Sequence, residues 1–294
     1  MGDKENASQP ALGAGAPGWV EVRLRPTLAQ ERRVLVRAMR RAGAACVWAP
    51  AGQVRGVWPD TPQARRAIAA LPLPANAPEP FLECFQAAGP RARWAEPPCQ
   101  RLHPRLTLAE AWSGLAAGAD TIIIDPLTAF GAGDHPSTRL NLMLLAGLLT
   151  ESPPPAGSWV ADVGAGTGVL ALAMALLAGL KVLAVDPDPA SARAVARNRA
   201  LNPLAGPLVH FARGCHDVLG ARLPLIAANL PGPILLVAAA HLVGSLEPGG
   251  RLVVSGFREE FAPGLAESLA GLGLAVRRRA QEAGWEGMVF SCGG

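Results

Sequence analysis

Tyrosine is absent from this 294-residue chain, and Lys4 and Lys181 are the only lysines among its 27 basic residues. Any aromatic wall of a binding site must therefore consist of phenylalanine or tryptophan. Long apolar runs are missing too, because the longest, Val169 to Leu180, is shorter than the roughly 20 residues that a membrane-spanning helix needs. The first ten residues, MGDKENASQP, lack the apolar core of a signal peptide. These absences predict a cytoplasmic protein with no membrane span.

Sequence patterns for metal binding and for a disulfide framework are also missing. The five cysteines include no C-x-x-C pair, and four of the five histidines are isolated, without the spacing of metal ligands. We therefore predict no metal site and reduced thiols. The residues concerned are Cys46, Cys84, Cys99, Cys215, Cys292, His103, His210, His216 and His241.

Composition divides the chain into four segments. Residues 1–18 combine glycine, alanine, serine and proline without periodicity, which predicts a disordered tail. Residues 19–88 are expected to form a small α+β domain and residues 89–118 a linker, since repeated prolines break long helices there. Residues 119–294 are expected to form a larger domain.

The small domain is predicted to contain five elements in the order βαββα, which suggests a ferredoxin-like α+β fold. Its arginines could contact RNA or an acidic partner, but they follow helical spacing, as on a solvated helix face. We therefore expect no requirement for a nucleic-acid partner. The expected strands are 19–24, 44–48 and 54–58, and the expected helices are 27–41 and 61–71.

Beyond residue 119, buried strands alternate with helices, which is typical of a doubly wound, Rossmann-like α/β domain. The expected strands are 121–124, 159–163, 181–186, 208–213, 225–229 and 251–255. The expected helices are 137–149, 168–177, 190–201, 234–246 and 260–272.

The strongest motif is WVADVGAGTG, residues 159–168, an apolar strand followed by a tight glycine turn. Glycines let the backbone approach a ligand, and the free N–H groups of the following helix favour an anionic group there. A dinucleotide fingerprint G-x-G-x-x-G needs glycine at its sixth position, where this chain has Val169. The spacing G-x-G-x-G after an acid-ended strand is similar to that of class I methyltransferases. A purely structural turn is the alternative.

Two further polar residues are expected at the same edge of the sheet. Asp186 ends the next strand, KVLAVD, where a carboxylate can accept hydrogen bonds from ribose hydroxyls. Asn229 ends a later strand within AANLPGP, where its amide could orient an accepting nitrogen. Each motif alone could also be an ordinary turn, but together they predict one site.

A fourth motif, DPLTAFGAGDHPSTRLNLMLL at residues 125–145, precedes the glycine loop. F-G-x-G-x-H-P-[ST]-T before D-x-G-x-G-[ST]-G resembles the ribosomal protein L11 methyltransferase (PrmA) family over roughly residues 92–294. The resemblance implies S-adenosylmethionine as cofactor, a ribosomal protein as substrate, and recognition of that protein by the small domain. It also implies catalysis by Asn229, which orients an amine. The predicted cofactor-binding residues are Phe130, Gly131, Thr138, Asp162, Gly164, Gly166, Gly168, Asp186 and Asn229.

The chain departs from the family pattern in two loops. Ala132, Asp134 and Ser137 stand where threonines are common, and only Leu230 and Pro231 separate Asn229 from the following glycine. Three alternatives therefore remain besides methylation of lysine or N-terminal amines on L11. They are a methyltransferase of this fold with another protein or a small molecule as acceptor, an inactive cofactor-binding or scaffold module, and an NAD-dependent dehydrogenase.

Overall fold

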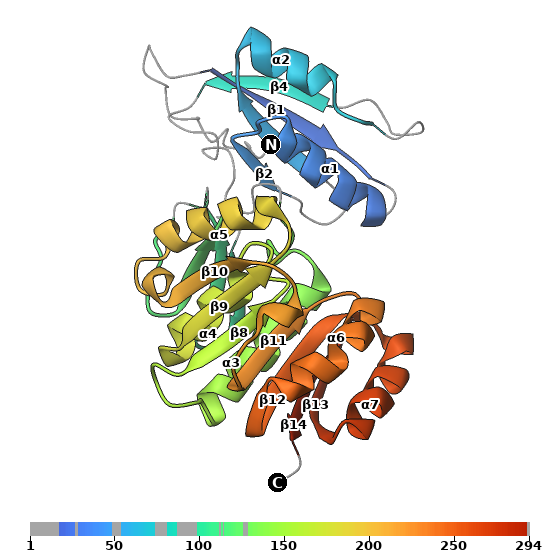
Figure 1. Ribbon diagram of the computed structural model, residues 1–294. Helices are drawn as coiled ribbons and strands as arrows, with labels where there is room; N and C mark the ends of the chain where they lie inside the picture. Colours follow the sequence, from blue (N-terminus) through green and yellow to red (C-terminus); the bar gives the residue numbers. More distant parts are fainter. Residues whose placement is uncertain are drawn as a thin grey trace, which may run out of the picture. The chain divides into compact units, whose positions relative to one another are not determined.

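The computed structural model describes residues 18–26, 29–48, 54–73, 81–86, 99–111, 113, 115–125 and 129–292 (Figure 1). Contacts divide the chain into two compact units, Met1–Pro97 and Pro98–Gly294. The predicted tail, apart from Gly18, and the first part of the predicted linker lie outside the described residues.

The first unit contains a four-stranded antiparallel sheet with the order β2-β3-β1-β4. Its element order, βαββαβ, is that of the ferredoxin-like arrangement, and it adds to the expected elements a fourth strand that the surrounding prolines hid. The elements are β1 (Gly18–Leu24), α1 (Ala29–Arg41), β2 (Cys46–Trp48), β3 (Val54–Pro59), α2 (Pro62–Ala69) and β4 (Phe81–Gln86).

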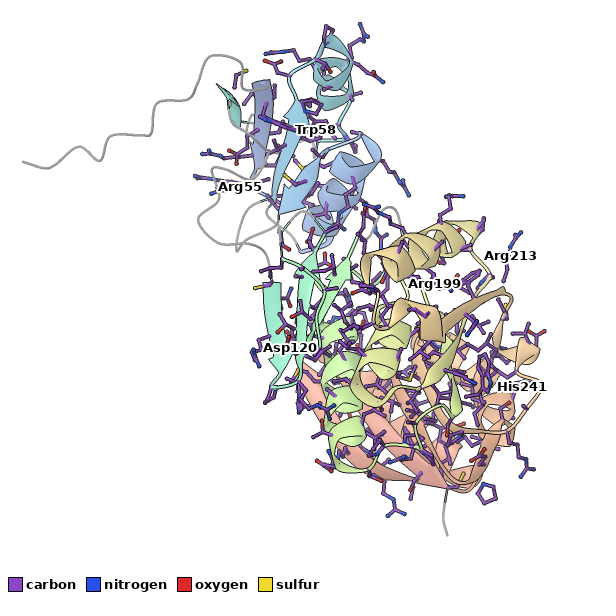
Figure 2. The ribbon with its side chains drawn as sticks, turned by 90° about the vertical axis from the view of Figure 1, so that its left-hand side faces the viewer. Arg55, Trp58, Asp120, Arg199, Arg213 and His241 are labelled. Carbon is purple, nitrogen blue, oxygen red and sulfur yellow. The ribbon has the colours of Figure 1, made fainter. Side chains whose placement is uncertain are left out.

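The core of this unit lies between the sheet and its helices. Val22 and Met39 are fully buried, as is Trp58, whose indole N–H donates to the carbonyl oxygen of Ala42 over 3.0 Å (Figure 2). This bond satisfies the polar atom of a buried tryptophan. Every buried member of the cluster comes from residues 20–71, so the unit has a core of its own.

The second unit contains a seven-stranded sheet with the order β10-β9-β8-β11-β12-β14-β13, in which only β14 runs antiparallel to its neighbours. Strand order reverses between β8 and β11, which is where ligands bind in open α/β sheets. The strands are β8 (Trp159–Val163), β9 (Lys181–Asp186), β10 (Val209–Arg213), β11 (Leu223–Asn229), β12 (Leu246–Arg258), β13 (Leu274–Glu282) and β14 (Trp285–Cys292).

Helices cover both faces of this sheet, as predicted for a doubly wound domain (Figure 1). Residues of α3, α4 and α5 join the apolar cluster on one face, whereas residues of α6 and α7 join the cluster on the other. The helices are α3 (Pro136–Glu151), α4 (Val169–Ala178), α5 (Pro189–Leu201), α6 (Gly232–Gly244) and α7 (Ala262–Gly271).

Two sequence-based expectations are wrong in this unit. Residues 99–110, expected in the linker, form β5 (Cys99–His103) and β6 (Leu106–Glu110). β7 (Thr121–Ile124), expected in the main sheet, instead pairs in parallel with β6 in a separate three-stranded sheet. The reason is apolar alternation in β6: Leu106 and Leu108 are buried and extend the cluster that contains Ile122 and Ile124.

No helix in the described part of the chain is long and apolar enough to cross a membrane.

Candidate functional site

The glycine loop connects β8 to α4. Gly164, Gly166 and Gly168 have φ angles of 78°, 53° and 80°, a left-handed region that favours glycine. A Cβ atom at Gly166 would lie 2.3 Å from the carbonyl oxygen of Phe130, so only glycine fits there. The N-cap of α4, Gly168, makes no side-chain hydrogen bond to the helix. Of the first-turn N–H groups of α4, that of Ala171 is accepted by Asp162, whereas those of Val169 and Leu170 have no acceptor within the helix and can serve a ligand.

The segment that precedes α3 lies directly on this loop. The Thr167 backbone N–H donates to the Phe130 carbonyl oxygen over 2.9 Å, and the Thr167 hydroxyl donates to the Gly131 carbonyl oxygen over 2.8 Å. Phe130 itself is 40% exposed. The structure thus brings together two motifs that are more than 30 residues apart, while Pro126–Thr128 of the fourth motif lie outside the described residues.

Asp162 has no exposed surface, and its Oδ2 atom accepts the backbone N–H of Ala171 in α4 over 3.0 Å. Its Oδ1 atom is buried without a hydrogen-bond partner. Burial, opposed by the hydrogen bond from Ala171 and assisted by the nearby charge of Asp186, raises the pKa of the carboxyl to about 7. The side chain therefore ties β8 to α4 from behind the glycine loop.

Asp186, at the end of β9, also makes a hydrogen bond to the glycine loop. Its Oδ2 atom accepts the Gly166 N–H over 2.9 Å, and its Oδ1 atom accepts the Asp188 N–H over 2.8 Å. The residue is 9% exposed. Each carboxylate oxygen retains a lone pair that can accept a further hydrogen bond.

Asn229, at the end of β11, lies in a polar network with α3 and β12. Its Nδ2 atom donates to Thr138 Oγ1 over 3.3 Å, and its Oδ1 atom accepts from Ser255 Oγ over 3.2 Å. Asn141 Nδ2 donates to Ser255 Oγ over 2.9 Å. Sequence reasoning had not singled out Ser255 or Asn141, although a lone asparagine among the leucines of a buried helix is a detectable signal.

His135 is the N-cap of α3. Its Nδ1 atom lies 2.7 Å from Ser137 Oγ and accepts the Ser137 N–H over 3.2 Å. Its ring packs edge-on against Trp285, with the centroids 4.5 Å apart, and lies 5.3 Å from the ring of Phe130. These contacts fix the start of α3, which carries Thr138.

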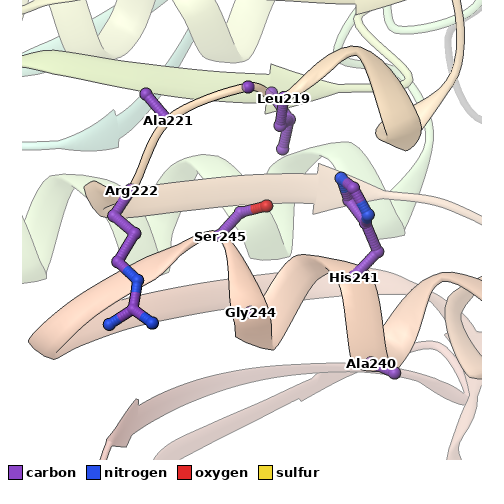
Figure 3. Close-up of a pocket in the computed structure, with 8 residues that line it drawn as sticks. Leu219, Ala221, Arg222, Ala240, His241, Gly244 and Ser245 are labelled. Atoms are coloured by element: carbon purple, nitrogen blue, oxygen red, sulfur yellow. The ribbon is translucent and has the colours of Figure 1, made fainter.

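A pocket of about 370 Å³ lies at the amino end of β11, at the opposite end of the strand from Asn229 (Figure 3). It is lined by residues 219–222, which precede β11, and by the last turn of α6 with Ser245. None of the predicted site residues lines it. Within the described residues, no group of three or more histidine, cysteine, aspartate or glutamate side chains is placed to hold a metal ion.

Comparisons with known proteins identify relatives of this chain. A family model described as ribosomal protein L11 methyltransferase (PrmA) matches residues 92–292. Proteins named ribosomal protein L11 methyltransferase are 37% identical over 183 residues in Pelotomaculum thermopropionicum and 31% identical over 208 residues in Listeria monocytogenes. These matches cover 62% and 68% of this chain, but only 58% and 65% of those proteins. The chain thus matches less than two thirds of the length of either relative.

A solved structure shows the same fold. The ribosomal protein L11 methylase of Lactobacillus delbrueckii subsp. bulgaricus is 28% identical, with a TM-score of 0.58. The match covers 66% of this chain and 98% of that one.

Proposed function

This chain belongs to the ribosomal protein L11 methyltransferase (PrmA) family, and we propose that it transfers methyl groups from S-adenosylmethionine to amines of that ribosomal protein. The observation that carries this proposal is the meeting of three groups at the carboxyl ends of adjacent strands. The glycine loop follows β8, Asp186 ends β9, and Asn229 ends β11. Ligands of open α/β sheets bind at this edge.

The glycine loop and Asp186 fit S-adenosylmethionine better than a dinucleotide. Among the described residues, Asp186 forms no ion pair, so its carboxylate is available to a ligand with hydroxyl donors. The sixth position of the dinucleotide fingerprint, which requires glycine, is Val169. S-adenosylmethionine, when bound, would supply a ribose diol and an electrophilic methyl group on a positively charged sulfur.

Each residue then has a defined task. The lone pairs left on Asp186 would accept the ribose hydroxyls, and the backbone N–H groups at the start of α4 would bind the ligand's carboxylate. Asn229 Oδ1 would accept a hydrogen bond from an N–H of the acceptor amine. This bond would direct the lone pair of the amine nitrogen at the methyl group. Because displacement at a methyl group mainly demands position, the site needs no covalent catalyst. The amine must be neutral, and burial in the site favours that form.

We assign recognition of the protein substrate to residues 19–88, whose ferredoxin-like unit has its own core. A ribosomal protein as acceptor implies that the enzyme works in the cytoplasm. No nucleic acid is required as a partner in this scheme.

Incubation with radiolabelled S-adenosylmethionine and purified L11 tests the proposal, with the methylated residues then mapped by mass spectrometry. We expect label on lysine or N-terminal amines of L11, and a loss of at least about 100-fold in rate for Asn229→Ala. That variant loses one predicted cofactor contact but should still bind S-adenosylmethionine by calorimetry, because the glycine loop and Asp186 are unchanged. Absence of label on L11, with label on other ribosomal proteins in a parallel incubation, would reject L11 as the methyl acceptor. Binding of NAD without binding of S-adenosylmethionine would reject the proposed cofactor.

A further inference from the structure

Two fully buried polar side chains stand behind Asn229 without reaching the surface. Asn141 lies on α3 and Ser255 on β12, and both have no exposed surface. Asn141 Nδ2 donates to the Ala228 carbonyl oxygen over 3.2 Å and to Ser255 Oγ over 2.9 Å. Its Oδ1 atom is buried and has no hydrogen-bond partner. An unpaired buried acceptor is costly, so leucine at this position would be the simpler choice for a core helix.

The direction of the hydrogen bonds in this group is fixed by one backbone atom. The Ala228 carbonyl oxygen can only accept, so the Asn141 amide must present its NH₂ end to it. The second hydrogen of that NH₂ group goes to Ser255 Oγ. Ser255 therefore turns its own hydrogen to Asn229 Oδ1. Asn229 is left with its Nδ2 atom facing Thr138 Oγ1.

We propose that Asn141 is a positioning residue that fixes, through Ser255, which end of the Asn229 amide faces the methyl acceptor. This inference rests on the proposed function. With Oδ1 held by Ser255, its second lone pair is available to an amine N–H at a defined place. If the amide rotated by 180°, it would present NH₂ to the amine hydrogens and repel them. Asn141 does not touch the substrate, since its side chain is fully enclosed.

The hydrogen bonds from Asn141 to Ser255 and from Ser255 to Asn229 form a relay. The experiment interrupts this relay at two points, with Asn141→Leu and Ser255→Ala. With L11 and S-adenosylmethionine, we expect kcat to fall about tenfold in each variant, while the calorimetric Kd for S-adenosylmethionine stays within about twofold. In the Asn229→Ala background, neither change should lower kcat further, because there is no amide left to orient. Ser255→Thr keeps the hydroxyl and is expected to retain most of the activity.

Asn202→Leu is the matched control. Asn202 is also buried and donates through Nδ2 to two backbone carbonyls, those of Ile123 and Asn198, which lie outside the network around Asn229. Because Asn202 Oδ1 also accepts the Ile123 N–H over 2.9 Å, we expect this variant to lower the melting temperature at least as much as Asn141→Leu does and to leave kcat unchanged. An equal loss of kcat in Asn202→Leu would overturn the proposal, because the loss would then reflect stability alone.

A second measurement does not depend on the acceptor. In a ¹⁵N-labelled protein, the side-chain NH₂ signals of Asn229, assigned through their absence in Asn229→Ala, should shift in Asn141→Leu and stay in place in Asn202→Leu. Unchanged Asn229 signals in Asn141→Leu would overturn the relay even if L11 is methylated. Failure to methylate L11, with the signals shifted as expected, would reject the proposed acceptor and leave the relay supported.

Discussion

The two carboxyl groups of the candidate site differ in what surrounds them. Asp186 accepts two backbone N–H groups and reaches the surface, whereas Asp162 accepts one and is sealed from solvent. Burial opposes ionisation of Asp162 and raises its pKa. Asp186 is therefore suited to bind a ligand, and Asp162 to hold the strand and helix behind the glycine loop.

Replacement of Asp186 by alanine is expected to weaken binding of S-adenosylmethionine at least tenfold. The change removes the acceptor for the ribose hydroxyls and leaves the Gly166 N–H without its partner. Hydrogen bonds to charged groups contribute about 1.5–3 kcal/mol, which corresponds to this range. Calorimetry measures the change, with Asp188→Ala as the control, because Asp188 caps α5 through the Ala190 N–H. Equal weakening in both variants would contradict the role of Asp186.

Asp162 predicts a specific dependence of stability on pH. The pKa of its carboxyl rises from an ordinary value of about 3.9 in the unfolded chain to about 7 in the folded one. Because the folded state binds the proton more tightly, this group stabilises the fold below pH ~4, and that stabilisation is lost as the pH rises through about 7. The substitution Asp162→Asn removes this loss.

Melting temperatures at pH 5 and pH 8 provide the measurement. We expect the melting temperature of Asp162→Asn, relative to that of the wild-type protein, to be several degrees higher at pH 8 than at pH 5. The neutral amide side chain of the variant leaves no charge to bury. Asp217→Asn, at an exposed position, should track the wild-type protein at both. A constant difference between Asp162→Asn and the wild type would show that the carboxyl titrates normally.

At the scale of elements, the glycine loop and the segment before α3 depend on each other. Gly166→Ala would place a Cβ atom against the Phe130 carbonyl oxygen and force a left-handed φ on alanine. We expect this variant to lose measurable binding of S-adenosylmethionine and to melt at a lower temperature, because the backbone of neither loop can yield without breaking the bond between Thr167 and Phe130.

Gly264→Ala is the control for that prediction. Gly264 lies in α7, and a Cβ atom there would meet nothing within 4 Å. Alanine in an exposed helix position is expected to raise stability by about 0.4–1 kcal/mol and to leave calorimetric binding unchanged. If Gly166→Ala bound the cofactor as tightly as Gly264→Ala does, the proposed contact between the loops would be wrong.

The elements also show how far sequence could predict this fold. Local signals were sufficient for β8, α4 and β9, because each is a mostly apolar segment, of which β8 and α4 are followed by glycine and β9 ends at an aspartate. Local signals failed for β13, whose three consecutive arginines hide a strand that is held by pairing with β14. They failed again for β5 and β6, since a short pair of strands among prolines gains its stability from distant partners such as Ile122.

The candidate site shows the same division. The residues at the ends of β8, β9 and β11 could be named from motifs, and cofactor binding by them stays a prediction. Asn141 is detectable as a lone asparagine in an apolar helix, but neither its role nor that of Ser255 could be predicted, because both depend on hydrogen bonds to Ala228 and Asn229 that link separate parts of the chain. Only the folded arrangement reveals such a network.

At the scale of the whole molecule, the chain divides into two units with separate cores. We expect the fragment 98–294 to bind S-adenosylmethionine with a Kd within a few-fold of that of the full chain, because all predicted cofactor contacts lie within it. Its kcat/KM for L11 should fall by at least about tenfold, because the proposed recognition unit is missing. Calorimetry and the methylation assay test the two parts, and undiminished methylation by the fragment would place substrate recognition in the second unit.

The sheet order has a consequence for how the protein is made. β13 precedes β14 in the chain, yet in the sheet it lies beyond β14, and β14 lies between β12 and β13. During synthesis, β12 therefore presents an unpaired edge until residues 285–292 have left the ribosome, and exposed edges invite pairing between chains. The same strand begins with Trp285, which packs on His135. Pairing of β14 with β12 thus covers the exposed edge and, in the same folding step, brings Trp285 against His135 at the start of α3.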